Sequence, residues 1–187
     1  MTARLQKNNF MGELKVSKFG KVSFEQFSAD MNDAFPDASW TTSDLEALYD
    51  AIKLPERATT GSAGYDIYTP STIQMTAGEY VKFPTGIRWV CDESDGNKVL
   101  IIVPRSGLGF REKLRLANTV GVIDSDYWQS DNEGDIWAKI TADSSLDLSA
   151  GQAFLQGIIL PFEITSDDNA SGVRNGGFGS TDTEEES

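Results

Sequence analysis

Short runs of strand-forming residues, separated by turn residues, dominate the chain after residue 54. In chain order, the predicted strands span residues 65–68, 72–75, 80–83, 86–91, 99–103, 114–123, 136–141 and 154–162. Many short strands at close spacing are typical of an all-β barrel or jelly roll. The run 99–103 is apolar throughout, which predicts the most buried strand, whereas alternation over 136–140 predicts one solvent-facing side.

A segment of different character, residues 21–53, precedes these strands and follows a predicted first strand that ends near Gly20. Its first half has apolar residues at helical spacing, namely Phe24, Phe27, Met31 and Phe35. Ser23 and Gln26 form a capping-box pattern, and Pro36 is a stop signal. We therefore predict a helix between Ser23 and Pro36.

The second half of this segment predicts another helix. Ser43 and Glu46 form a second capping-box pattern, and the helix is expected to end before Pro55. One apolar face is formed by Leu45, Leu48, Tyr49 and Ile52. We expect the resulting helical hairpin to cover an edge of the β core with its apolar faces, and the alternative is that it binds a protein partner.

The chain accordingly divides into four parts. They are an N-terminal segment with the first strand (1–20), the helical hairpin (21–53), a β core (54–166) and a C-terminal arm (167–187). The arm is rich in Gly, Asp, Ser and Asn, so it cannot pack a core of its own. We expect it to be flexible unless a ligand orders it.

Composition narrows the possible functions. The 187 residues include 29 acidic and 16 basic ones, and the net charge of −13 argues against a general nucleic-acid or anionic-membrane surface. The chain has no His and a single Cys, Cys91, which excludes imidazole catalysis, a disulfide framework and a Cys-rich zinc site. No stretch has the apolar length of a membrane span, and we expect a cytoplasmic protein.

Arg105, Ser106 and Gly107 have the residue types that a triphosphate requires. Arg offers a forked donor to phosphate oxygens, Ser a short hydroxyl, and Gly lets backbone N–H groups approach the anion. The apolar run 99–103 just before them would provide a rigid support. By itself, an Arg at a strand end is also compatible with a surface salt bridge.

Asp124 ends an apolar run, three residues before the aromatic ring of Tyr127. Gly121 within this run allows a bulge or a close backbone approach, so a small ligand could press against the strand. An Asp against an apolar wall, with water on one side, is suited to deprotonate an attacking water molecule. The alternative is an ordinary polar turn after a strand.

Five motifs in order favour the functional interpretation. They lie at residues 57–66, 104–109 and 117–127, at Gln156, and at residues 174–181. Together they resemble the motifs of the trimeric dUTPases over about residues 54 to 181. The resemblance implies a distorted jelly-roll barrel of the β-clip type, with the helical hairpin as an insertion, assembled as a homotrimer.

The resemblance also implies an activity, the hydrolysis of dUTP to dUMP and pyrophosphate by water attack on the α-phosphorus. Asp124 would be the base, Gln156 would help to fix the phosphates or the water, and Asp66 would hold Mg²⁺ through water. The residues expected at uracil and the sugar are Asn118, Gly121, Ile123 and Tyr127. Those expected at the phosphates, or closing over the base, are Arg105, Ser106, Gly107, Arg174, Phe178, Gly179, Ser180 and Thr181.

Three features depart from the commonest family pattern. The Gly that usually follows the motif Tyr closely is delayed to Gly134, Ala153 replaces a frequent Arg, and the arm has one residue fewer between Arg174 and Phe178. Two alternative functions stay open at this stage. One is a dCTP deaminase of the same superfamily, and the other is a regulatory, nucleotide-responsive binding module that uses residues 21–53.

Overall fold

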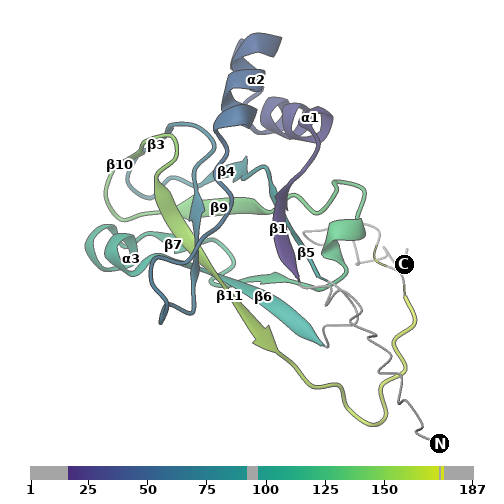
Figure 1. Cartoon of the computed structure of the whole chain (residues 1–187). Coiled ribbons are helices and arrows are strands. Elements are labelled where there is room, and N and C mark those ends of the chain that lie inside the picture. Colours follow the sequence, from purple (N-terminus) through teal and green to yellow (C-terminus); the bar gives the residue numbers. More distant parts are fainter. Residues whose placement is uncertain (1–16, 92–96, 173, 175–187) are drawn as a thin grey trace, which may run out of the picture.

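The computed structural model describes residues 17–91, 97–172 and Arg174 (Figure 1). Its elements in chain order are β1 (Lys18–Lys21), α1 (Phe24–Ala34), α2 (Thr42–Ala51), β2 (Tyr65–Tyr68), β3 (Ile73–Met75), β4 (Val81–Pro84), β5 (Ile87–Val90), β6 (Lys98–Pro104), α3 (Ser106–Glu112), β7 (Arg115–Leu116), β8 (Gly121–Ile123), the short helix η2 (Tyr127–Gln129), β9 (Trp137–Thr141), β10 (Leu146–Leu148) and β11 (Ala153–Pro161). Strands predominate, and the predicted all-β class is confirmed.

The strands of the described part of the chain pair antiparallel in four small sheets. One sheet has the order β2-β11-β6-β8, another β4-β9-β7, and β1-β5 and β10-β3 pair separately. Figure 1 shows the four-stranded sheet at the end of the molecule away from α1 and α2. This arrangement of short antiparallel sheets is consistent with the predicted jelly-roll type.

Apolar side chains from these sheets form one core. The rings of Phe83 in β4 and Phe154 in β11 are 5.4 Å apart and both fully buried. Trp89 and Ile67 are also buried in this cluster, as is the thiol of Cys91, which accepts from the Ser17 hydroxyl at 3.4 Å. The core fixes the four-stranded sheet, which carries the predicted site residues Asp66, Gly121, Ile123 and Gln156.

Helices α1 and α2 form a second, smaller cluster and dock on the turn between β4 and β5. Phe27 and Met31 are fully buried in this cluster. At Gly86 a Cβ would lie 2.5 Å from Ile52 Cδ1 and 2.9 Å from Phe27 Cδ2, and φ is +70°. Only Gly satisfies both conditions, so this residue allows the helices to approach the β core.

Both predicted helix caps differ in part from the structure. The Ser23 hydroxyl accepts from the Gln26 N–H, but the Ser23 N–H donates to Glu133 and not back to Gln26. Helix α2 begins two residues earlier than predicted, because Thr41 and Asp44 form its capping box in place of Ser43 and Glu46. Both pairs satisfy the same spacing rule, so the pattern cannot choose between them.

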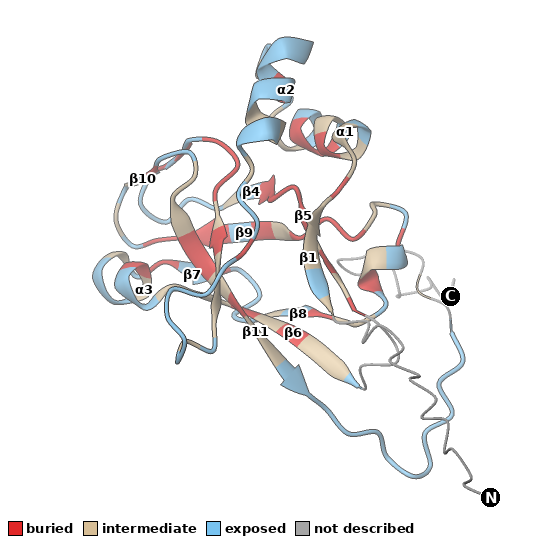
Figure 2. Ribbon diagram, viewed as in Figure 1, coloured by how far each residue is buried: buried red, intermediate tan, exposed pale blue. Residues whose placement is uncertain are grey.

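The prediction that residues 99–103 form the most buried strand is wrong for the single chain. In β6 only Leu100 and Ile102 are buried, and the other residues of the strand are half-buried (Figure 2). Antiparallel partners share a face, so the half-buried residues of β6 lie beside exposed ones on β8 and β11. The outer face of the four-stranded sheet is therefore apolar, and it consists of Val99, Ile101, Val103, Val122, Ile158 and Leu160.

The other differences concern short elements. The predicted strand over residues 114–123 is split into β7 and β8 by a turn in which Thr119 has a left-handed φ of 67°. Helix α3 and strand β10 were not predicted. Helix α3 contains two Gly residues, which disfavour helix, and it is held by the buried side chain of Leu108.

Candidate active site

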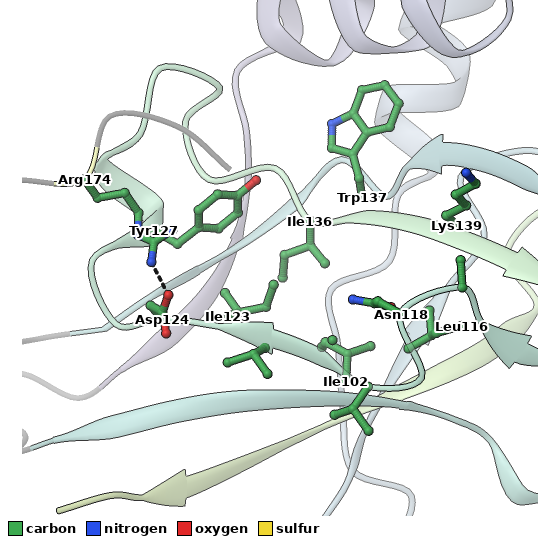
Figure 3. Close-up of a pocket in the computed structure, with 14 residues that line it drawn as sticks. Ile102, Leu116, Asn118, Ile123, Asp124, Tyr127, Ile136, Trp137, Lys139 and Arg174 are labelled. Carbon is green, nitrogen blue, oxygen red and sulfur yellow. Dashed lines mark hydrogen bonds and ion pairs between the residues drawn. The ribbon is translucent and has the colours of Figure 1, made fainter. Parts of the chain in front are cut away.

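A pocket of about 350 Å³ lies between the segment 115–123, strand β6 and the start of β9. We call this segment the hairpin, because a tight turn joins β7 to β8, although the two strands pair with different neighbours. Its apolar wall includes Ile102, Leu116, Ile123 and Ile136. Figure 3 shows Asp124, Tyr127 and Arg174 gathered at one end, with Asn118 near the opposite end. The structure thus brings together six predicted site residues, namely Asn118, Gly121, Ile123, Asp124, Tyr127 and Arg174.

The hairpin owes its shape to local backbone geometry. The Thr119 N–H donates to the Leu116 carbonyl and the Val120 N–H to the Asn118 carbonyl, which closes a tight turn around Asn118. At Gly121 a Cβ would lie 2.9 Å from the Cβ of Ile102. Gly121 is therefore needed so that β8 can approach β6, and this contact forms the inner wall of the pocket.

Asp124 directly follows β8 and pairs with Arg174 of the arm. The Arg174 guanidinium donates to Asp124 Oδ2 and, at 2.9 Å, to Asp126 Oδ1. The Asp124 side chain is 48% exposed, so water can reach it. The same guanidinium lies 5.9 Å from the centre of the Tyr127 ring. Asp124, the general base expected from the sequence, is thus paired with a positive charge at the entrance of the pocket.

Tyr127 is buried at the start of a loop that we call the rim loop, residues 128–135. Its hydroxyl donates to the Asp135 carbonyl at 3.0 Å and accepts from Asn132 Nδ2 at 2.9 Å. Burial raises the pKa of Tyr127 above its ordinary value of 10.0, so the hydroxyl stays protonated as a donor. These two bonds fix the ring at the end of the pocket.

A second cluster lies on the same sheet but not at this pocket. Arg105 Nε is 3.1 Å from Asp66 Oδ1. Gln156 is the direct partner of Asp66 across β2 and β11, and its amide lies 3.5 Å from the Pro104 carbonyl. Ser106 and Gly107 begin α3 and are exposed. Asp66, Arg105 and Gln156 are therefore close to one another, whereas Arg174, also expected at the phosphates, lies at the pocket.

Strand register separates the two clusters within one chain. Ile123 pairs with Leu100, so Asp124 lies near Val99, at the opposite end of β6 from Arg105. The six residue-to-residue steps from Val99 to Arg105 span about 20 Å at the rise of a β-strand. A water molecule activated by Asp124 could not also lie beside Arg105 of the same chain.

Comparison with known proteins identifies the family. The dUTPase family model matches residues 50–181. The chain is 36% identical over 135 residues to deoxyuridine 5'-triphosphate nucleotidohydrolase of Lactococcus lactis, covering 70% of this chain and 88% of the relative. It is 38% identical over 145 residues to the same enzyme of Hahella chejuensis, covering 73% and 91%. The chain belongs to the dUTPase family.

Solved structures agree with this assignment. The dUTPase of Streptococcus mutans superposes with a TM-score of 0.58 at 28% identity, covering 80% of this chain and 98% of that one. A dUTPase variant from phage phi11 of S. aureus, solved with a structural Mg(II) ion, has a TM-score of 0.54 at 18% identity and supports the fold alone. The family match begins at residue 50, so most of the helical hairpin precedes it.

The dUTPase-family site contains few candidate metal ligands. The described residues include no group of three acidic or Cys side chains that could hold a metal ion. Asp66 is a single carboxylate beside Arg105. One carboxylate fits Mg²⁺ that is bound mainly by substrate phosphates and water.

None of the described helices is long and apolar enough to cross a membrane.

Some site residues lie elsewhere or were not predicted. Phe178, Gly179, Ser180 and Thr181 lie outside the described residues. Trp137 and Lys139 line the pocket although the motifs did not include them. Alternation along residues 136–140 placed these two on one face of a strand, but only the folded hairpin shows that this strand borders the pocket.

Proposed function

We propose that the chain hydrolyses dUTP to dUMP and pyrophosphate. The observation that carries this proposal is Asp124, a half-exposed carboxylate at the end of an apolar pocket in a chain of the dUTPase family. The pocket, at about 350 Å³, is large enough for a pyrimidine ring and part of a sugar. Asp124 can orient a water molecule and accept its proton as that water attacks the α-phosphorus.

The pocket supports selection of the base and the sugar. The turn of the hairpin offers the Asn118 amide and backbone groups to the edge of uracil, and Ile102 and Ile123 supply an apolar floor. The Tyr127 ring is held by its hydroxyl, so its face would support the deoxyribose at a fixed height. An added 2'-hydroxyl would meet this ring, and this is the proposed basis for rejecting UTP.

Arg174 has to exchange partners during the reaction. In the structure its guanidinium neutralises Asp124 and Asp126. A triphosphate offers stronger, multiply charged acceptors to the same fork. We propose that Arg174 turns toward the phosphates when the nucleotide enters and leaves Asp124 free to act as a base. Phe178, Gly179, Ser180 and Thr181 of the arm would then close over the nucleotide.

The Asp66 cluster supplies the proposed phosphate end. Arg105 and the exposed Ser106 and Gly107 can donate to phosphate oxygens, and Gln156 can hold a phosphate oxygen or the attacking water. Asp66 would hold Mg²⁺ through water. When bound, Mg²⁺ neutralises charge on the triphosphate.

We further propose a homotrimer in which each site is shared between chains. Two observations support it. The outer face of the four-stranded sheet is apolar and half-exposed in one chain, with Val122 58% and Leu160 44% exposed. In addition, Asp124 lies at one end of this sheet, and Asp66, Gln156 and Arg105 lie at the other. Packing one copy on another would cover the apolar face and could bring unlike ends together.

A pyrophosphate-release assay with dUTP, dTTP, dCTP and UTP tests the function. The proposal predicts turnover of dUTP with Mg²⁺ and at least about a hundredfold lower kcat/KM for UTP, because the Tyr127 ring excludes its 2'-hydroxyl. Ammonia release from dCTP without pyrophosphate would identify a deaminase and contradict the proposal. No turnover of any of the four nucleotides would also contradict it.

A further inference from the structure

Two departures from the family pattern, helix α1 and the rim loop, contact each other. Glu133 of the rim loop accepts from the Ser23 N–H at 2.8 Å and from the Ser23 hydroxyl at 2.6 Å. The backbone of Glu133 has a left-handed φ of 55°, which is uncommon for a residue other than Gly. Its side chain is held in place by the two hydrogen bonds from Ser23. The beginning of α1 is thus tied to the loop that follows Tyr127.

A second link lies deeper, between Asp30 of α1 and Asp135 at the end of the rim loop. Asp135 is fully buried, and its Oδ1 accepts from the Gly86 N–H at 2.9 Å. The Oδ2 atoms of both carboxyl groups are buried and have no N–H or O–H donor among the described residues. The Asp30 carboxyl group lies close enough to Asp135 to raise its pKa. A single proton held between the two carboxyl groups would satisfy both oxygens at once, as a hydrogen bond between Asp135 and Asp30.

Asp135 also contacts Tyr127 directly. Its backbone carbonyl is the acceptor for the Tyr127 hydroxyl, and the Asn132 amide bridges the same two groups, at 2.9 Å from the hydroxyl and 3.3 Å from the carbonyl. A displacement of Asp135 therefore displaces the acceptor that fixes the ring. The chain of contacts runs from α1 through Asp30 and Asp135 to the end of the pocket.

We propose that Asp30 is a positioning residue for dUTP binding: its hydrogen bond to Asp135 fixes the rim loop and, through it, the Tyr127 ring. This inference rests on the proposed function, because it assigns Tyr127 to the sugar. The helical hairpin then acts on the site without touching the nucleotide. Other charged groups nearby are already engaged, since Arg88 lies 3.7 Å from Glu133, and Arg174 pairs with Asp124 and Asp126.

The test compares Asp30→Ala with Asp30→Asn in the full chain, and Asp33→Ala on the exposed side of the same helix is the matched control. In Asp30→Asn the amide can donate to an ionised Asp135, so the link survives without a shared proton. In Asp30→Ala the link is lost and a buried carboxyl loses its partner. If Asp30→Ala does not fold, Asp30→Ser replaces it, because it also lacks the carboxyl group but keeps a small polar side chain at this position.

Two measurements are made on each variant. Hydrogen exchange of the 128–136 backbone should be about tenfold faster in Asp30→Ala than in the control, and near wild type in Asp30→Asn. KM for dUTP should rise about five- to thirtyfold in Asp30→Ala while kcat stays within about threefold, because the ring supports substrate and transition state alike. Asp30→Asn should restore most of the change in KM.

The outcomes separate this inference from the proposed function. If Asp30→Ala matches Asp33→Ala in both exchange and KM, Asp30 does not position the loop and the proposal is overturned. If KM for dUTP rises as much in Asp30→Asn as in Asp30→Ala, the link does not act through hydrogen bonding, and the proposal is again overturned. Absence of dUTP turnover in the wild type would contradict the proposed function, and the exchange data would still decide whether Asp30 holds the rim loop.

Discussion

The proposed nucleotide pocket and the Asp66 cluster lie on the same four-stranded sheet but are built by different means. The pocket is complete within one chain, because a tight hairpin, close packing of Gly121 on Ile102 and a hydrogen-bonded Tyr127 fix its walls. The Asp66 cluster is a surface pair with Arg105, whose side chain is 43% exposed. Steric fit is therefore the main feature of the pocket at one end of the sheet, and charged side chains are the main feature of the Asp66 cluster at the other end.

This difference suggests separate roles in selectivity and affinity for the two ends of the sheet. A rigid apolar pocket can discriminate between bases and sugars before any chemistry occurs. Exposed charges bind phosphate of any nucleotide, so they contribute affinity but little selectivity. Substitutions at the two ends should therefore fail in different ways, and the following predictions run from the largest expected effect to the smallest.

Replacement of Asp124, the proposed general base, should have the largest effect. Asp124→Asn keeps the shape of the side chain but removes its ability to accept a proton, so kcat should fall by roughly 10² to 10⁴ while nucleotide binding largely survives. Steady-state kinetics and calorimetric titration with a non-hydrolysable dUTP analogue would measure the two quantities. Asp126→Asn is the control and should change kcat by less than about threefold. Equal loss of binding and turnover in Asp124→Asn would show that this residue is structural.

Loss of positive charge in the Asp66 cluster should mainly reduce affinity for dUTP. Arg105→Ala removes charge-assisted hydrogen bonds to phosphate, so kcat/KM for dUTP should fall about 10- to 100-fold. The preference for dUTP over UTP should stay within about threefold of wild type, because the pocket is untouched. Competition kinetics with both nucleotides would measure this preference. A large loss of preference would contradict the proposed division between shape and charge.

Close packing of β8 on β6 should be sensitive to one methyl group. In Gly121→Ala the new Cβ would lie 2.9 Å from the branched Ile102 Cβ, and we expect a loss of about 1 to 3 kcal/mol in the free energy of unfolding. Gly157→Ala is a matched control, since its Cβ would meet the movable end of Leu100 at 2.9 Å. Urea unfolding should rank Gly121→Ala as the less stable variant. The reverse order would mean that the pocket wall can shift easily.

The buried acid at the rim loop should give a small dependence of stability on pH. Burial, and then the neighbouring Asp30, raise the pKa of Asp135 well above its ordinary value of 3.8. The folded state keeps a proton that the unfolded state releases, so the free energy of unfolding falls as pH rises from about 4 toward the folded pKa, by at most about 1.4 kcal/mol per pH unit.

Asp135→Asn isolates this contribution, because its amide can still accept from Gly86 and donate to Asp30 without titrating. Urea unfolding between pH 5 and pH 8 should show a smaller decline for the variant than for the wild type. Other titrating groups, such as Glu133, whose pKa is lowered by its bonds to Ser23, contribute equally to both proteins. Parallel curves would show that Asp135 keeps one protonation state across this range.

Sequence reasoning succeeded where chemistry depends on residues close in the chain. Asp124 and Tyr127 are three residues apart, and the structure places both at the pocket. It failed where the outcome depends on distant partners. In α1, Asp30 looks like an ordinary polar position of an amphipathic helix, and only the fold brings it to Asp135, 105 positions away.

The errors in the fold have similar causes. The turn at Thr119 was missed because Val and Thr favour strands, and the hydrogen bonds from Thr119 to the Leu116 carbonyl and from Val120 to the Asn118 carbonyl override that preference. The apolar run in β6 predicted burial on both faces, but one chain covers only one face. Hydrophobicity in that run corresponds to the proposed assembly of several chains better than to a single chain.

The central claim is that Asp124 of one chain works with Arg105 of another. It can be tested with mixed trimers made by co-expressing Asp124→Asn with an Arg105→Ala/Gln156→Ala chain under two affinity tags, purified over both. In a ring of three shared sites, every mixed trimer has one complete site, so dUTP turnover below saturation should reach about one third of wild type. Either variant alone should stay below about one tenth. Mixed trimers no more active than the separate variants would contradict the account, because each site would then be built within one chain.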